Sequence, residues 1–362
     1  MIVRFLLRHT AARRPVGFVL LGVCVLCAIL VSPVAVLRGR RPARFAAFAR
    51  SYLAVEIAGL WQLARLRRAP AEAHYELLHR LLSRLFDAAR RDFDLRILPP
   101  APAPELPRGP LIIASRHAGP GDSFLLVYGL LAFAGRGPRV VLSQLLMLDP
   151  FIDILLHRTE NCFVDIDEDE RRHVPERIAR IVATLGPHEA LVIFPEGRKF
   201  TTARRRRLIE RLRARRAALL RRARELEHVL PPHSSGLFAA IDAAPPGTQV
   251  AFVAHTGLDH IESVRETWDA VPLTSAVEAT WWTVPLDAIP QDTSAREEWL
   301  RAEWLRVDAW IELHASPACV DAAAGVPDVP AARETETVAA PDAPALDVTQ
   351  PHPVPARSEQ GL

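Results

Sequence analysis

The sequence predicts an α/β protein in which a partly parallel central sheet is flanked by helices and preceded by an N-terminal membrane-anchoring helical segment. Residues 111–114 and 190–194 are short, continuous apolar runs of the kind that buried parallel strands show. Turns that contain glycine follow both runs, at residues 119–121 and 195–197, so each strand is expected to end in a loop. A charge-free stretch at residues 15–37 sets the first part of the chain apart.

Composition divides the 362 residues into three parts. We expect residues 1–70 to form a transmembrane or interfacial anchor, residues 71–318 to form the α/β domain, and residues 319–362 to be a disordered tail. From residue 320 onward the chain has seven prolines, seven acidic residues and two arginines, without apolar periodicity. Removing the tail's charge of −5 from the total of +3 leaves the rest near +8, which suits anionic partners.

The charge-free stretch has the length of a membrane anchor. Residues 15–37 would form a helix about 34 Å long, enough to cross a hydrocarbon core of about 30 Å. The stretch is too long for a cleaved signal peptide, and arginines flank both of its ends, so charge gives no orientation. A second apolar stretch, residues 45–63, carries Arg50 and Glu56 and suits the membrane interface. If it spans instead, the pair forms a hairpin with a cytoplasmic amino terminus. We expect the protein at the cell membrane, with its α/β domain in the cytoplasm.

Two further helices are predicted from periodicity. Residues 73–93 form an amphipathic pattern, and a proline-rich linker at residues 99–110 leads from it into the first strand. Residues 201–230 carry 11 arginines, with leucines along one helical face at positions 208, 212, 219, 226 and 230. This basic helix is either a solvated face over the core or a surface attracted to anionic lipid, and we favour the second. Nucleic acid is not an expected partner, because aromatic residues are not interleaved with the arginines and an anchor adjoins.

The C-terminal part of the chain and the cysteines are expected to have structural roles. Ser294 and Glu297 have the spacing of a capping box before a helix at residues 299–313, whose tryptophans are expected in the core. Cys24 and Cys27 lie inside the apolar stretch, so their spacing does not indicate a redox or metal pair. The other two cysteines are isolated, and neither a disulfide framework nor a metal site is expected.

A histidine and an aspartate accompany the first turn. Asp122 precedes a predicted helix at residues 123–133 and occupies the N-cap position. A strand, a glycine-rich turn and a helix start can fold this carboxylate back onto the imidazole of His117. Such a pair is the base and orienter of a catalytic triad. Since no serine or cysteine is spaced as a nucleophile, the proton removed would come from a substrate hydroxyl. Alternatively, Asp122 only caps the helix and His117 is a structural strand-end histidine.

The second turn adds an acid and two cations. Glu196, like His117, follows a predicted strand, and ligands bind at the carboxyl edge of open parallel sheets. Arg198 and Lys199 place positive charge where an anionic substrate needs it, and Lys199 is the only lysine in the chain. The structural alternative is a plain turn with a solvated Arg-Lys pair.

In their order and spacing, His117-x4-Asp122 and residues 194–197 resemble the motifs of the glycerolipid acyltransferase family, that is, 1-acyl-glycerol-3-phosphate acyltransferases and related lysophospholipid acyltransferases. The likeness extends over residues 105–315. Its further matches are Phe200-Thr201 with the basic segment, the Leu230 to Gly236 stretch, residues 284–290, Trp299, Trp304 and Asp308.

The resemblance implies that a fatty acyl group moves from an acyl-CoA or acyl-carrier-protein thioester to the hydroxyl of a lysophospholipid. His117 would be the general base and Asp122 its orienter. Glu196 and Gly197 would shape the acceptor pocket, with Arg198 and Lys199 near the acceptor phosphate. No metal or bound cofactor is implied, and the partners would be membrane lipids and the acyl donor.

The sequence departs from the family pattern in its anion-binding residues. Ile166 stands where the family's second motif usually has an arginine, and three nearby arginines are candidates to replace it: Arg158, Arg171 and Arg172. After Gly197 the third motif has Arg198-Lys199 instead of Thr-Arg, so a point charge replaces a guanidinium fork. The missing arginine motivates a second hypothesis, a non-catalytic lipid-binding or scaffolding relative.

Overall fold

The computed structural model describes residues 7, 9–98, 100, 106–119, 121–164, 172–213, 217–259, 261 and 264–315. The chain divides into two units, Met1–Gly325 and Val326–Leu362, and every described residue lies in the first. The expected tail, residues 319–362, lies outside the described residues.

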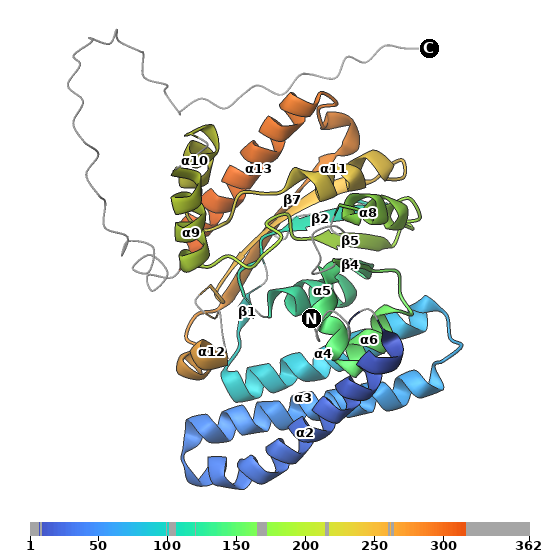
Figure 1. The fold of residues 1–362 in the computed structure, drawn as a ribbon, viewed down its shortest axis with the longest axis vertical. Coiled ribbons are helices and arrows are strands. Elements are labelled where there is room, and N and C mark those ends of the chain that lie inside the picture. The colour runs from blue at the N-terminus through green and yellow to red at the C-terminus, as the bar shows by residue number, and fades with distance from the viewer. Residues whose placement is uncertain are drawn as a thin grey trace, which may run out of the picture. The chain divides into compact units, whose positions relative to one another are not determined.

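A mostly parallel sheet forms the centre of the first unit, as the sequence predicts (Figure 1). Within the described residues it has seven strands in the order β1-β7-β6-β2-β5-β3-β4. Neighbouring strands run parallel except β6 and β7, which are antiparallel. The strands are β1 Ile97–Leu98, β2 Leu111–Ser115, β3 Gly137–Ser143, β4 Cys162–Val164, β5 Glu189–Ile193, β6 Gln249–Thr256 and β7 Val277–Pro285.

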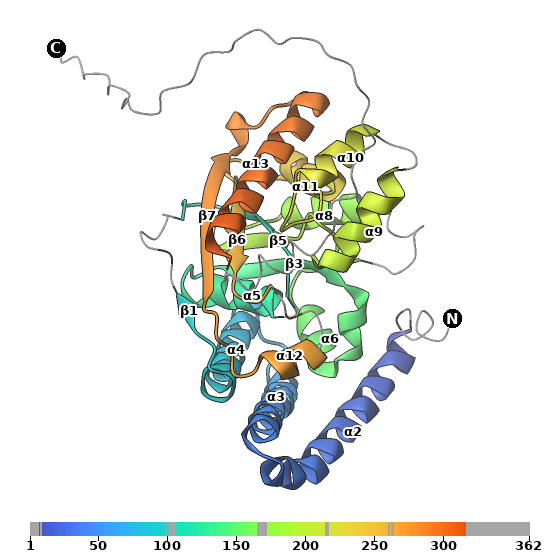
Figure 2. The ribbon, with the colours of Figure 1, turned by 90° about the vertical axis from the view of Figure 1, so that its left-hand side faces the viewer.

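Helices cover both faces of the sheet. One face packs against α8 (Val174–Val182), α11 (Ser234–Ala243) and α13 (Thr293–His314), and the side chain of Trp304 is fully buried in this layer. The other face packs against α5 (Asp122–Ala132), and α4 (Ala71–Phe93) lies against α5 in turn (Figure 2). Continuous apolar strands are therefore buried on both sides, as expected of a parallel sheet.

The N-terminal segment forms two long helices on the outside of α4. Helix α3 (Arg40–Arg65) packs along α4, and α2 (Thr10–Leu37) packs along α3 (Figures 1 and 2). Within the described residues, α2 is the one helix long and apolar enough to cross a membrane. Near its N-terminal end, Arg13 Nη2 and Arg14 Nε bind the buried carboxylate of Asp153, at 2.7 and 3.0 Å. Asp153 lies in α6 (Pro150–Leu156), so α2 is tied to the α/β domain.

The basic segment does not form the single helix that its leucine spacing predicts. It forms α9 (Thr202–Arg213) and α10 (Ala217–Arg224), which pack together. Leu226 and Leu230 are buried beyond the end of α10. The backbone there is bonded to α9, since Arg205 Nε donates to Leu226 O at 2.6 Å.

The predicted capping box is also wrong. Helix α13 begins at Thr293, and the side chain of Asp292 accepts the N-cap hydrogen bond from Ala295 N at 2.9 Å. The shorter elements of the described chain are η1 (Gln144–Leu148), α12 (Val264–Ala270) and η2 (Leu286–Ala288).

Candidate active site

Three neighbouring strands end at one edge of the sheet and carry the candidate site. β2 leads to His117, β5 leads to Glu196, and β6 leads to Asp259. The strands are parallel, and Ala114 of β2 pairs with Ile193 of β5, so their carboxyl ends lie side by side. The motifs predicted from sequence therefore meet in space at the edge where α/β proteins bind ligands.

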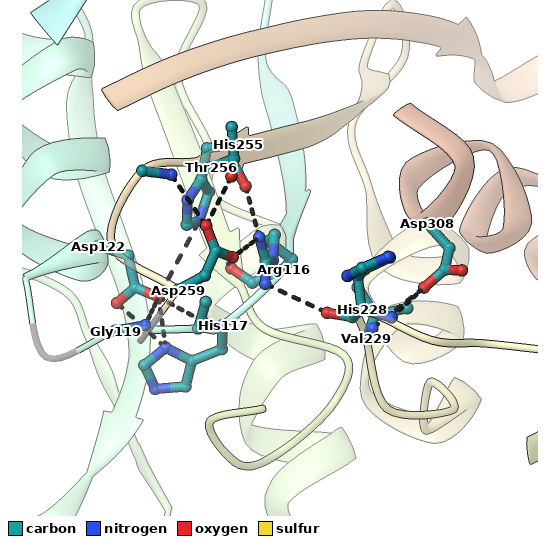
Figure 3. Close-up of polar contacts among 12 residues, drawn as sticks. Arg116, His117, Gly119, Asp122, His228, Val229, His255, Thr256, Asp259 and Asp308 are labelled. Atoms are coloured by element: carbon teal, nitrogen blue, oxygen red, sulfur yellow. Dashed lines mark hydrogen bonds and ion pairs between the residues drawn. The ribbon is translucent and has the colours of Figure 1, made fainter. Parts of the chain in front are cut away.

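His117 and Asp122 form the predicted pair. Nδ1 of His117 lies 3.1 and 3.0 Å from the two carboxylate oxygens of Asp122 (Figure 3). The side chain of His117 is 18% exposed whereas that of Asp122 is 1% exposed, so the base is accessible and its orienter is buried. The ring of Phe194 packs against the imidazole, with centroids 4.6 Å apart. Among the described residues the imidazole hydrogen-bonds Asp122 alone, which leaves Nε2 available to a substrate.

The Asp122 carboxylate is held by main-chain donors as well as by His117. It accepts hydrogen bonds from three backbone N–H groups, those of Ala118 at 2.7 Å, Gly119 at 3.0 Å and Ser123 at 2.8 Å. Burial raises the pKa of this carboxyl, but the hydrogen bond and charge of His117 and the backbone donors bring the pKa below its ordinary value. Asp122 is the first residue of α5 and not its N-cap, because its carboxylate turns back to the strand-end turn.

Glu196 joins two loops through their backbones. Its Oε1 accepts from the backbone N–H of His117 at 2.7 Å, and its Oε2 accepts from that of Leu230 at 2.8 Å. The side chain is buried. Burial raises the pKa of the Glu196 carboxyl to about 8, against the lowering effect of these two donors. Glu196 therefore fixes the main chain on which His117 sits.

The turn after Glu196 requires glycine. Gly197 has φ = +65°, a left-handed conformation, and a Cβ there would lie 3.3 Å from Cδ2 of His233. Gly197 N donates to Phe194 O at 2.9 Å and closes the turn. Three residues after Gly197, the backbone N–H of Phe200 donates to His117 O at 2.5 Å, so the turn is bound to the histidine.

Arg198 and Lys199 differ in exposure. Arg198 is exposed and Lys199 is half-buried. Burial lowers the pKa of the Lys199 ammonium, the carboxylate of Asp122 opposes this, and the Arg204 guanidinium adds to it. Lys199 directly precedes Phe200, whose N–H binds His117 O, so the turn holds Lys199 near the base.

Comparison with known proteins identifies this arrangement. Residues 100–253, which include both turns, match the family model described as Acyltransferase. This match supports assignment of these residues to the glycerolipid acyltransferase family. Sequence comparison with curated proteins found no match.

A solved structure shares the fold. It is the crystal structure of the 1-acyl-sn-glycerophosphate (LPA) acyltransferase PlsC from Thermotoga maritima, at 12% sequence identity and a TM-score of 0.51. The alignment covers 80% of the present chain and 99% of the Thermotoga chain. At this identity the likeness shows the fold.

Of the three arginines proposed to replace the family's motif-two arginine, Arg158 binds the N-terminal helices. Nη1 of Arg158 donates to Leu63 O at 2.6 Å and lies 3.4 Å from Nε2 of His74, so it bonds α3 and α4. Arg172 is exposed in the turn before α8. Arg171 and Ile166 lie outside the described residues.

Two residues that support the acyltransferase site were not singled out from sequence. Arg116 is buried and forms an ion pair with Asp259 beyond β6. The signal available was a charged residue directly after a fully buried strand, because such a side chain needs a buried partner.

The C-terminal tryptophan and aspartate hold the segment that reaches Glu196. Trp304 Nε1 donates to Leu230 O at 2.9 Å. The Asp308 carboxylate accepts from the backbone N–H groups of three successive residues at 2.7–3.1 Å, those of Glu227, His228 and Val229 (Figure 3). Trp304 and Asp308, which match the family pattern, therefore hold the backbone of residues 227–230 in place.

One group of described residues has the composition of a metal site. Ligand atoms of Glu227, His228 and Glu312 lie within 4.8 Å of one another. The two glutamates are exposed, and Nε2 of His228 already contacts the Glu312 carboxylate. We interpret the group as an ion pair on the surface.

Proposed function

We propose that this acyltransferase moves a fatty acyl group from an acyl-CoA or acyl-carrier-protein thioester to the hydroxyl of a lysophospholipid, such as 1-acyl-glycerol-3-phosphate, in phospholipid synthesis or remodelling. The observation that carries the proposal is the His117–Asp122 pair, in which a buried carboxylate orients an accessible imidazole. The cationic turn at Arg198 and Lys199, joined to His117 through Phe200, supports an anionic acceptor.

In the proposed reaction His117 acts as general base. Its Nε2 takes the proton of the acceptor hydroxyl while the hydroxyl oxygen attacks the thioester carbonyl. The C–S bond then breaks, and the imidazolium returns its proton to the leaving thiolate, giving an ester and a thiol. Asp122 keeps the proton of neutral His117 on Nδ1 and stabilises the imidazolium. The acceptor, the donor and these side chains complete the proton and electron balance, so no bound cofactor is invoked.

The acceptor phosphate is assigned to the turn after Glu196. Lys199 is half-buried on the turn that Phe200 joins to His117, so its ammonium can bind a phosphate while the acceptor hydroxyl faces His117. Arg198 is exposed next to it and adds positive charge. The Thermotoga protein is a 1-acyl-sn-glycerophosphate acyltransferase, which supports the same acceptor class.

We assign membrane contact to the outer face of α2. Apolar side chains there are exposed, among them Phe18, Leu26 and Leu30. Because α2 is tied at Asp153 and packs along α3, its apolar face supports insertion into the lipid interface beside the α/β domain. We place the protein at the cell membrane and the α/β domain in the cytoplasm, where acyl thioesters are made. The exposed arginines of α9 and α10 fit an anionic surface.

The test is transfer of radiolabelled oleoyl from oleoyl-CoA, and from an oleoyl-carrier protein, to a panel of lysophospholipids that differ in head group. We expect the full-length protein to acylate lysophosphatidate and His117→Ala to lose at least about 10³-fold in rate with its fold intact. His188→Ala, which alters an exposed histidine on the loop before β5, is the matched control and should keep wild-type turnover. Absence of turnover with every acceptor would overturn the proposal in favour of a non-catalytic lipid-binding relative.

A further inference from the structure

An ion pair between a buried arginine and a partly buried aspartate lies directly behind His117. Arg116 is 1% exposed, and its guanidinium contacts the carboxylate of Asp259, which lies 143 positions further along the chain (Figure 3). The same carboxylate accepts hydrogen bonds from Thr256 Oγ1 at 2.6 Å and Gly257 N at 2.9 Å. Asp259 is thus fixed to the end of β6, and Arg116 is fixed to Asp259.

Arg116 also binds two carbonyl groups from separate segments. Its Nη1 donates to His255 O at 2.6 Å, and its Nη2 donates to His228 O at 3.2 Å. In the other direction, Nε2 of His255 faces the carbonyl oxygen of Arg116 at 3.3 Å. The guanidinium therefore joins the ends of β2 and β6 and the segment that follows α10.

These contacts connect Arg116 back to its neighbour His117 through the segment after α10 and Glu196. The segment that His228 begins supplies Leu230 N to Glu196, and Glu196 binds the backbone N–H of His117, the neighbour of Arg116. The backbone at Arg116 and His117 therefore contacts two buried side chains: His255 at the Arg116 carbonyl and Glu196 at the His117 N–H. Removing one partner would leave a buried charge uncompensated, so the ion pair and the carbonyl contacts of Arg116 together restrain the main chain.

We propose that Arg116 and Asp259 are positioning residues for acyl transfer. Their ion pair fixes the backbone at residues 116 and 117, so that the imidazole keeps its contact with Asp122 while Nε2 faces the substrates. The kinetic test of this inference rests on the proposed function. Neither side chain touches the reacting atoms.

The kinetic test uses Asp259→Asn, the double variant Arg116→Leu/Asp259→Leu, and a control. With oleoyl-CoA and 1-oleoyl-glycerol-3-phosphate, we expect Asp259→Asn to lower kcat at least about tenfold with both KM values within about twofold. The double variant removes both charges, so its thermal midpoint should recover relative to Asp259→Asn while kcat stays low. Glu189→Gln breaks the Arg139–Glu189 pair at the opposite end of the strands and should leave kcat per folded protein within about twofold of wild type.

Hydrogen exchange gives a readout that does not depend on turnover. In Asp259→Asn the backbone amides of His117, Ala118 and Gly119 should exchange at least about tenfold faster, whereas those of Leu191 and Val192 should not change. Unchanged exchange at residues 117–119 would overturn the proposal, as would faster exchange with wild-type kcat, or a double variant whose kcat recovers together with its stability. If the wild-type protein transfers no acyl group, the proposed function fails, and the exchange experiment still decides whether the ion pair positions His117.

Discussion

Glu196 holds the backbone of His117 across 79 positions of sequence, with its Oε1 accepting the N–H of His117 at 2.7 Å. Asp122 holds the ring of the same residue through Nδ1. The two motifs therefore divide the work: the acid of the second turn fixes the main chain, and the acid of the first turn fixes the imidazole. Such double restraint is what a base needs in order to meet its substrate without reorganising.

Replacing Glu196 by glutamine should keep the shape of the side chain and remove one of its two hydrogen bonds to the backbone. The amide oxygen of Glu196→Gln can still accept one backbone N–H, but its NH₂ group would face the other donor in a buried place. Leaving that donor unsatisfied should lower the free energy of unfolding by about 1–3 kcal/mol. We expect a matching fall in kcat/KM, because the backbone of His117 loses part of its support. Urea titration and initial rates measure the two effects.

The control for this variant is Glu297→Gln, which makes the same change at an exposed position of α13. It should alter the free energy of unfolding by no more than about 0.5 kcal/mol. Equal effects of the two substitutions would mean that the bridge from Glu196 to His117 contributes nothing.

Asp122→Asn should abolish most activity with little change of shape. The amide cannot stabilise an imidazolium, and its NH₂ group would face backbone N–H donors that the carboxylate oxygens now accept. By analogy with triads that lose their orienting carboxylate, kcat should fall by about 10³–10⁴-fold. Single-turnover rates would measure this, with Asp287→Asn as the exposed control. A loss below tenfold would assign Asp122 the purely structural role of holding the turn.

Much of this site could be predicted because strand ends and turns have local signals. Residues 111–114 form most of β2 and residues 190–193 form most of β5, at the places that the apolar runs indicate. His117 and Asp122 meet because the six residues between strand β2 and helix α5 form one tight turn, and a turn is a short-range structure.

The elements that were predicted wrongly depend on distant partners. Leucine spacing predicts one helix through Leu226, but Asp308, about 80 positions away, takes the backbone N–H groups of residues 227–229 and fixes that segment in a different conformation. The capping error, in contrast, is local: Asp292 and not Ser294 accepts the N-cap hydrogen bond, which Ala295 N donates. The Arg116–Asp259 pair joins residues 143 positions apart, which no local pattern encodes.

Asp259 should give the protein a defined acid sensitivity. Burial raises the pKa of this carboxyl, but the charge of Arg116 and the Thr256 hydroxyl outweigh it and bring the pKa to about 2. A carboxyl whose folded pKa lies below its ordinary value stabilises the fold above that ordinary value, and the contribution is lost as pH falls through about 2. Between pH 5 and pH 2 the wild type should lose about 2 kcal/mol more than Asp259→Asn. Urea titrations across this range measure it, and parallel curves for the two proteins would contradict it.

The apolar face of α2 should determine membrane binding. Leu26 and Leu30 are 56% and 64% exposed on this helix. Leu26→Glu/Leu30→Glu should lower the partition coefficient onto phosphatidylethanolamine–phosphatidylglycerol vesicles at least about 100-fold, since burial of each leucine is worth about 1.5–3 kcal/mol. Leu313→Glu changes an 81% exposed leucine of α13 and should sediment with vesicles like the wild type. Equal binding by all three proteins would remove α2 from the membrane contact.

Lys199 should contribute to acceptor affinity more than to the rate of the chemical step. A charge-assisted hydrogen bond is worth about 1.5–3 kcal/mol, so Lys199→Met should raise KM for lysophosphatidate about 10- to 100-fold while kcat changes little. Lys199→Arg keeps the charge and should recover most of the affinity, because Arg can bind phosphate through its fork. A neutral monoacylglycerol acceptor is the matched control, and its KM should be the same in wild type and Lys199→Met. If the neutral acceptor is affected as strongly as lysophosphatidate, Lys199 supports the turn at Gly197 and does not bind the phosphate.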